Sequence, residues 1–136
     1  MPGYSESIRN ARLDLITSAL DAGSGPGVLQ IYAGNRPTTG TAVTDQTLLG
    51  TLTFSSPAAP AASGGILTFS TITQDDAADT DGTATWARAA DSDGTFVGDF
   101  SVGAIGSGAD IELNVITIVE SGPISIATAT ITAGNG

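Results

Sequence analysis

Apolar and polar residues alternate along the chain from residue 28 onward, and this period of two constrains the fold more than any other feature. A strand places successive side chains on opposite faces, so such alternation is typical of strands buried on one side. Turns rich in Gly, Asp, Ser and Pro separate the alternating segments. We therefore predict a mainly β domain, an antiparallel sandwich or barrel of about seven strands, near residues 28–33, 48–54, 66–72, 83–90, 95–102, 111–119 and 124–133.

One N-terminal α-helix is predicted ahead of the strands, over residues 5–22. Ser5 is a suitable N-cap, and Gly23 opens a glycine-rich segment that ends the helix. Arg9 and Arg12 fall angularly among the apolar positions, so we expect them to extend from the edge of that face or to meet a carboxylate on a neighbouring surface. The helix is amphipathic, with Ile8, Ala11, Leu15, Ile16 and Ala19 on one side and Glu6, Asn10, Asp14, Thr17 and Asp21 on the other.

The length of 136 residues predicts a single domain over 1–136, made of the helix at 5–22 and a β-domain at 28–133. The strongest hairpin signal is Asp91-Ser92-Asp93-Gly94, because Asp and Gly tolerate the positive backbone angles of tight turns. Near the C-terminus the apolar phase shifts, from Ile111 and Leu113 to Ile116 and Ile118. Either a β-bulge or burial of Ile116 and Ile118 against another subunit explains this shift.

The chain contains no histidine, cysteine or lysine. Imidazole, thiolate and amine groups supply most bases, nucleophiles and metal ligands near neutral pH, so we expect a protein that is not an enzyme and uses no cofactor. A catalytic serine would need histidine or lysine as its base. The absence of cysteine also excludes a disulfide framework.

The densest acidic segment, residues 74–82, superficially resembles a calcium loop, with Asp75, Asp76, Asp79 and Asp81 as candidate ligands. The spacing of an EF-hand loop fails. If Gly82 were its sixth position, Ala77 and Arg88 would stand at the first and twelfth, where oxygen ligands are required. We therefore favour a solvated acidic loop over a metal site, and turn formation for Asp91 and Asp93.

The formal net charge is −10, with 14 acidic residues against 4 basic ones. Nucleic-acid binding depends on a clustered basic surface, and the four arginines form no such patch in the sequence, so we expect no nucleic acid as partner. An anionic membrane is disfavoured for the same reason. The N-terminal residues lack the basic and apolar regions of a secretory signal, so we expect no export by that route.

Several segments of the chain are distinctive when taken together: residues 4–14, 21–27, 29–32, 34–37, 52–55, 57–61, 82–88 and 91–94. They resemble one family, the small acidic proteins of tailed bacteriophages and prophages that are encoded among head and tail morphogenesis genes. The resemblance covers most of the chain and implies a structural component of the virion, assembled in the bacterial host cytoplasm. It implies no catalytic residues.

Within that family, a capsid decoration or cement protein on the outside of the head shell fits the residues best, and a neck or tail component is the alternative. The expected partners are the major capsid protein or other virion proteins and further copies of the chain, with a trimer implied by the family. Outside that class, an extracellular adhesin or matrix subunit and a calcium-dependent binding module remain open. The residues predicted to lie at an interface are Ile8, Arg9, Arg12, Pro57, Pro60, Ile116 and Ile118.

Overall fold

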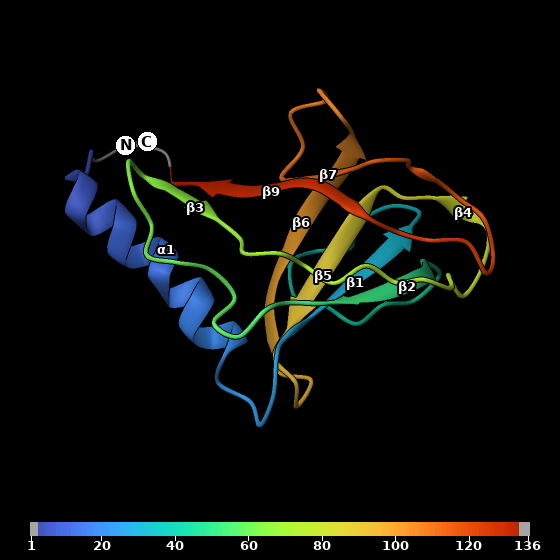
Figure 1. Cartoon of the computed structure of the whole chain (residues 1–136), viewed down its shortest axis with the longest axis horizontal. Helices are drawn as coiled ribbons and strands as arrows, with labels where there is room; N and C mark the ends of the chain where they lie inside the picture. Colours follow the sequence, from blue (N-terminus) through green and yellow to red (C-terminus); the bar gives the residue numbers. More distant parts are fainter. Residues whose placement is uncertain (1–2, 134–136) are drawn as a thin grey trace.

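The computed structural model describes residues 3–133 and confirms a mainly β, sandwich-like fold with one N-terminal helix (Figure 1). The large sheet has the order β2-β1-β5-β6-β7-β9-β3, and β4 pairs with β8 in a small second sheet. The large sheet ends at β2 and β3, so the domain is not a closed barrel. The described strands are β1 (Val28–Ala33), β2 (Thr47–Thr53), β3 (Ile66–Thr68), β4 (Gly82–Thr83), β5 (Trp86–Ala90), β6 (Phe96–Ala104), β7 (Ile111–Leu113), β8 (Thr117–Ile118) and β9 (Ile126–Thr132).

The two halves of the large sheet enclose the core. In Figure 1, β9 crosses in front of β6 and β5, and β3 continues the front layer beside α1. Leu29 and Ile31 of β1 and Ala87 and Ala89 of β5 point inward and are fully buried, as the alternation predicts. The small alanine side chains let the second layer approach β5 closely. Phe54 from the end of β2 and Phe69 from beyond β3 fill the same core, with ring centroids 5.2 Å apart.

One strand pair departs from the antiparallel pattern: β6 and β7 run parallel, with Val102 opposite Ile111. Parallel neighbours ordinarily need a long crossover connection, because the chain must return to the starting end of the first strand. Here residues 105–110 alone make that return. Gly106 and Gly108 have φ values of 85° and 83°, which other residues rarely adopt, and they make this compact loop possible. Ser101 and Asp110 then bond each other's backbone N–H groups, at 3.2 and 2.9 Å.

The predicted hairpin at residues 91–94 is confirmed, and its first residue organises it. The Asp91 carboxylate is buried and accepts the backbone N–H groups of Asp93 and Thr95, both at 2.9 Å. Gly94 follows with a φ of 89°. This is the side-chain-to-backbone bonding that makes Asp a common turn residue.

The apolar phase shift near the C-terminus has its cause within the chain. The phase changes after Leu113, where the chain leaves the large sheet at the end of β7 and joins the small one as β8. The irregular register of β7 on β9 places its additional residue, Ala127, in β9 and so does not shift the phase of residues 111–118. Ile111 and Leu113 face the core from the first sheet and Ile118 from the second. Two sheets that meet the same core therefore require two phases of alternation.

Helix α1 (Glu6–Leu20) begins where the sequence predicts, with the Ser5 hydroxyl accepting the backbone N–H of Ile8 at 3.3 Å. It ends at Leu20, two residues before the predicted end, with Asp21 as the C-cap. In the described residues, no helix combines the length and hydrophobicity that a membrane crossing requires.

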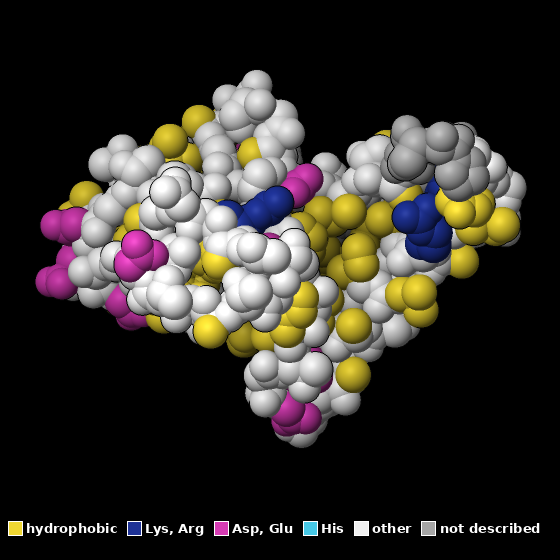
Figure 2. Space-filling view, turned by 180° about the vertical axis from the view of Figure 1, so that it is seen from behind, with side chains coloured by type: hydrophobic (Ala, Val, Ile, Leu, Met, Phe, Trp, Pro, Cys, Tyr) yellow, Lys and Arg dark blue, Asp and Glu magenta, His cyan; other side chains and the backbone are white. Residues whose placement is uncertain are grey.

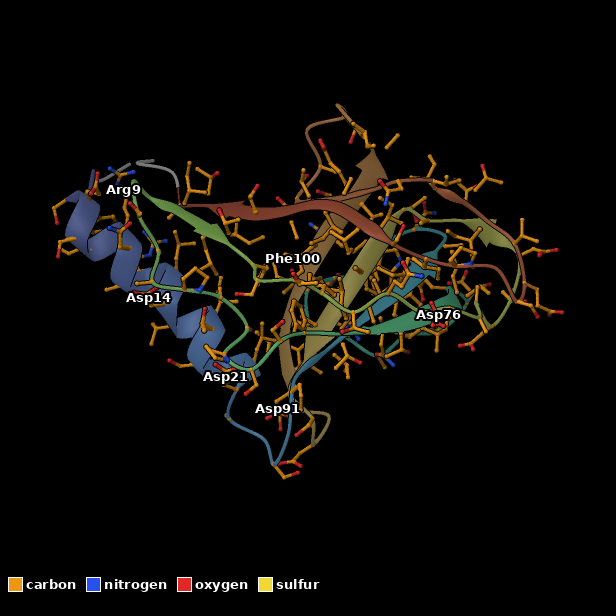
Figure 3. All side chains as sticks on the ribbon, in the orientation of Figure 1. Arg9, Asp14, Asp21, Asp76, Asp91 and Phe100 are labelled. Carbon is orange, nitrogen blue, oxygen red and sulfur yellow. The ribbon has the colours of Figure 1, made fainter. Side chains whose placement is uncertain are left out.

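The side of α1 that packs on the domain is its polar side. Leu13 and Leu20 are buried there, whereas Leu15 on the apolar side is 68% exposed. Three polar side chains on the packed side accept backbone N–H groups of the β2–β3 connection, residues 54–65. Asn10 accepts from Gly65 at 2.9 Å, Asp14 from Ala62 at 2.8 Å and Asp21 from Ala58 at 3.1 Å. Figure 3 shows Asp14 and Asp21 beside this connection.

Replacing one of these three acceptors tests whether they hold α1 in place. Asp14→Ala leaves the N–H of Ala62 without its acceptor, and we expect the free energy of unfolding to fall by about 1 kcal/mol. Urea denaturation followed by circular dichroism measures the loss. Ser18→Ala, on the exposed side of α1, is the control for the higher helix propensity of alanine. Equal stability of the two variants would contradict the role assigned to Asp14.

Candidate interaction surface

Part of the apolar side of α1 is exposed, although Ile16 on that side packs against the core. Its outer face consists of Ile8, Ala11, Arg12 and Leu15, which share one side of the helix at spacings of three and four. Ile8 is 49% and Leu15 68% exposed. Figure 2 shows hydrophobic and arginine side chains side by side at the end of the molecule that holds α1. An amphipathic helix in a globular protein normally covers such a face, so this one is a candidate binding surface.

The two arginines of α1 have different surroundings. Arg12 is exposed, and its guanidinium lies 5.4 Å from the centre of the Tyr4 ring. Arg9 lies at the border between α1 and the β2–β3 connection, where a Cβ at Gly65 would overlap its Nη1. The Arg9 Nε is buried and has no hydrogen-bond partner. Arg12 therefore lies on the outer face, whereas Arg9 packs between α1 and the β2–β3 connection.

The other residues predicted to lie at an interface do not join the outer face of α1. Pro57 and Pro60 are exposed, but they flank Ala58 and Ala59, which are buried in the core. Ile118 is 3% exposed, and Ile116 packs against the core cluster. The domain's own core thus accounts for the burial of both isoleucines, and their place in an interface stays a prediction.

The candidate calcium ligands bond to the protein itself. Asp75 accepts the N–H groups of Thr51 and Ala77, Asp76 accepts from the Gln74 amide, and Asp81 accepts from the N–H of Glu120. Asp79 is exposed. Within residues 3–133 the structure brings together no group of three or more acidic side chains that could hold a metal ion.

A second polar cluster lies on the outside of the large sheet, on β1, β5 and β6. Arg88 and Asp99 stand directly opposite each other, with Nε to Oδ1 at 2.8 Å and Nη2 to Oδ2 at 3.1 Å. The guanidinium also lies over the rings of Trp86 and Phe96, at 5.3 and 5.2 Å. Trp86 stacks on Tyr32 with ring centroids 4.5 Å apart.

The titration of this cluster follows from its geometry. The hydrogen bond to Asp99 raises the pKa of Arg88, and burial raises the pKa of Tyr32. Arg88 and Tyr32 are therefore held in the forms that they already have at neutral pH. In the described part of the chain Arg88–Asp99 is the one ion pair, and it joins the neighbouring strands β5 and β6.

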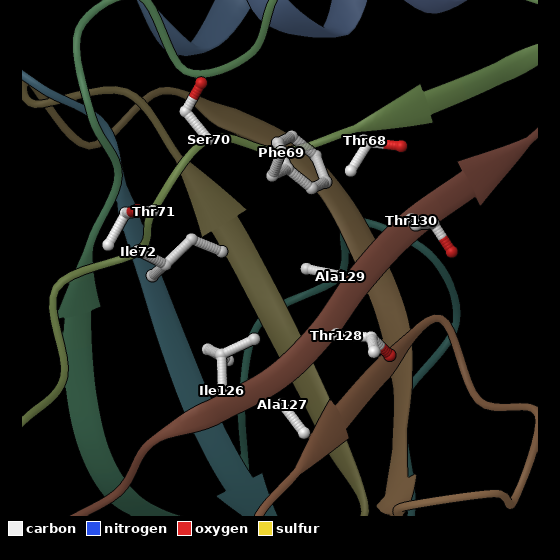
Figure 4. Close-up of a pocket in the computed structure, with 10 residues that line it drawn as sticks. All are labelled: Thr68, Phe69, Ser70, Thr71, Ile72, Ile126, Ala127, Thr128, Ala129 and Thr130. Carbon is white, nitrogen blue, oxygen red and sulfur yellow. The ribbon is translucent and has the colours of Figure 1, made fainter.

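A cavity of about 380 Å³ lies where the chain beyond β3 diverges from β9 (Figure 4). Phe69 still bonds to Ala129 across the gap, through its N–H at 3.1 Å. The next residues of the first segment turn instead toward the β2–β3 connection, through the bond from Ser70 N–H to Ala58. The lining consists of threonine and serine hydroxyls and apolar side chains, from segments 68–72 and 126–130.

The sequence reasoning missed the structural use of the polar side of α1. Asn10, Asp14 and Asp21 are spaced by four and seven residues, which places them on one side of a helix. A proline-containing connection that forms no strand needs acceptors for its N–H groups. Together these two patterns were a usable signal that the polar side packs inward.

The comparisons with known proteins assign no relative. No protein-family model, no curated protein and no solved structure matches the chain.

The Arg88–Asp99 pair generates a stability prediction. Arg88→Met leaves the Asp99 carboxylate, which is 1% exposed, without its counter-ion, and we expect a loss of about 3 kcal/mol in the free energy of unfolding. Chemical denaturation measures it. Arg88→Met/Asp99→Leu removes both charges and should recover part of the loss. An Arg88→Met protein as stable as the parent would show that the pair contributes little.

The loop between β6 and β7 generates a pH prediction. Glu112 accepts the N–H groups of Gly108 and Gly106, at 2.9 and 3.3 Å, and these bonds lower its pKa. A lowered folded pKa adds stability above the unfolded pKa, and this stability is lost as the pH falls through the folded pKa. NMR titration should give Glu112 a lower pKa in the folded protein than in the unfolded chain. Equal values in the two states would contradict the bonds.

Proposed function

We propose that this protein is a non-enzymatic structural component of a tailed-phage virion, of the capsid decoration type, and that the outer face of α1 binds a neighbouring subunit in the particle. The single observation that carries the proposal is the exposure of this apolar face on a helix whose other side is held by three hydrogen bonds. A face held rigidly in position loses little conformational entropy when it binds.

The charge of the chain supports the same role. A net charge of −10 keeps the free protein soluble despite its exposed leucine and isoleucine. Binding then buries apolar area that water covers in the free protein, which favours association. The resemblance to phage proteins supplies the setting: assembly in the host cytoplasm, with the major capsid protein or other virion proteins as partners.

The absence of histidine, cysteine and lysine also favours a structural role over a catalytic one. Of the remaining ionisable groups, Arg88 pairs with Asp99, and several other carboxylates accept backbone N–H groups. These side chains hold loops and strands in place. They are poorly available as acids or bases.

Purified phage particles test the proposal. We expect the protein in a copy number comparable with that of the major shell protein, measured by quantitative mass spectrometry. Arg12→Glu/Leu15→Glu should be lost from particles, because it adds negative charge to the outer face without touching the packed side of α1. Ile105→Glu is the matched control, since Ile105 is 63% exposed on the loop between β6 and β7.

The circular dichroism spectrum should be the same for the parent and both variants. A protein that is absent from intact particles would overturn the proposal. Full incorporation of Arg12→Glu/Leu15→Glu would overturn the role of the outer face.

A further inference from the structure

The end of the molecule opposite α1 carries a surface of complementary character. We call it the acidic end; it consists of Asp76, Asp79, Asp81, Glu120 and Val119. In Figure 1, α1 lies at one end of the longest axis and β4, with the chain that follows β8, at the other. Figure 2 shows acidic side chains gathered at that far end. The two surfaces therefore lie too far apart to meet within one molecule.

The acidic end is a rigid part of the fold. β4 pairs with β8, and next to this pair Asp81 accepts the N–H of Glu120 at 2.6 Å. Ala78 and Gly122 are joined by a further backbone bond of 2.8 Å. Val119, which is 62% exposed, is held between these bonds as an apolar residue among carboxylates. The surface thus combines apolar area with negative charge in a fixed arrangement.

The outer face of α1 has the converse composition. Ile8 and Leu15 supply apolar area, and Arg12 supplies a positive charge that meets no carboxylate, because Arg88–Asp99 is the one ion pair of residues 3–133. At the acidic end, Asp79 and Glu120 are exposed and their carboxylates bond to no described residue. The two surfaces thus carry charges of opposite sign, and each also exposes apolar side chains. Complementary protein interfaces combine these two properties.

We infer that the outer face of α1 binds the acidic end of a second copy of this chain. The inference deepens the proposed function and rests on its use of the outer face as a surface that becomes covered. The contact joins two different surfaces, so each bound pair still presents a free outer face and a free acidic end. Such head-to-tail association continues into a ring or an open row of subunits.

The test uses the purified full chain and two variants that each block one surface. Leu15→Glu blocks the outer face. Asp79→Arg/Glu120→Arg replaces two of the four negative charges of the acidic end by positive ones, which cancels its net charge without removing the Asp81 bond. We expect the parent to form oligomers in light scattering coupled to size exclusion, and each variant alone to be a monomer. Ile105→Glu should associate like the parent.

Mixing the two variants gives the decisive result. Each retains the surface that the other lacks, so the mixture should form a dimer with one copy of each and nothing larger. Added salt should weaken this dimer, because exposed charges are screened over about 10 Å at 0.1 M ionic strength. A monomeric parent, a mixture without dimer, or oligomers of Asp79→Arg/Glu120→Arg alone would overturn the head-to-tail contact.

The results separate this inference from the proposed function. If the parent is a monomer while Leu15→Glu is lost from particles, the outer face binds a different virion protein and only the head-to-tail contact is wrong. If the parent forms the expected oligomers but is absent from particles, the contact is correct and the virion role is wrong.

Discussion

The backbone N–H groups of the β2–β3 connection impose the constraint on which the rest of the structure depends. This connection passes beside the core, with Ala58 and Ala59 buried, and its residues next to α1 join no strand. Unpaired N–H groups in such a place are costly. Asn10, Asp14 and Asp21 supply the missing acceptors, and this bonding turns the polar side of α1 inward.

The exposed outer face of α1 is a direct consequence of this arrangement. A helix that presents its acceptors to a loop presents the residues of its opposite side to solvent, and in α1 these include Ile8 and Leu15. The domain tolerates the exposure because Leu13 and Leu20 still bury apolar area on the packed side. The fold therefore holds the exposed outer face of α1 in a fixed position.

Carboxylates have a similar structural role elsewhere in the molecule. Asp91 organises the hairpin before β6, and Asp110 and Glu112 hold the loop between β6 and β7. Asp75 accepts the N–H of Thr51 in β2 through its side chain, while its backbone pairs with Ile124. Each accepts backbone N–H groups that a sheet ladder does not reach. In this chain the negative charge thus contributes to architecture as well as to solubility.

Several predictions from the sequence were local, and the structure confirms them: the cap at Ser5, the turn at Asp91 and the alternation in β1 and β5. The predicted strand at 83–90 divides into β4 and β5, and the one at 111–119 into β7 and β8. At the second break the phase of the alternation changes, from Ile111 and Leu113 in β7 to Ile118 in β8, because two different sheets face one core. The alternation of apolar and polar residues does not indicate which strand pairs with which.

The amino-acid sequence by itself determined the β-rich class, the position of the helix and the lack of histidine, cysteine and lysine chemistry, because these follow from local spacing and residue type. Only the tertiary structure decided which side of α1 faces the domain and which carboxylates lie at the opposite end. Those outcomes depend on where distant N–H groups find acceptors. The periodicity of one helix contains no information about a loop whose N–H groups lie 37 to 55 residues further along the chain.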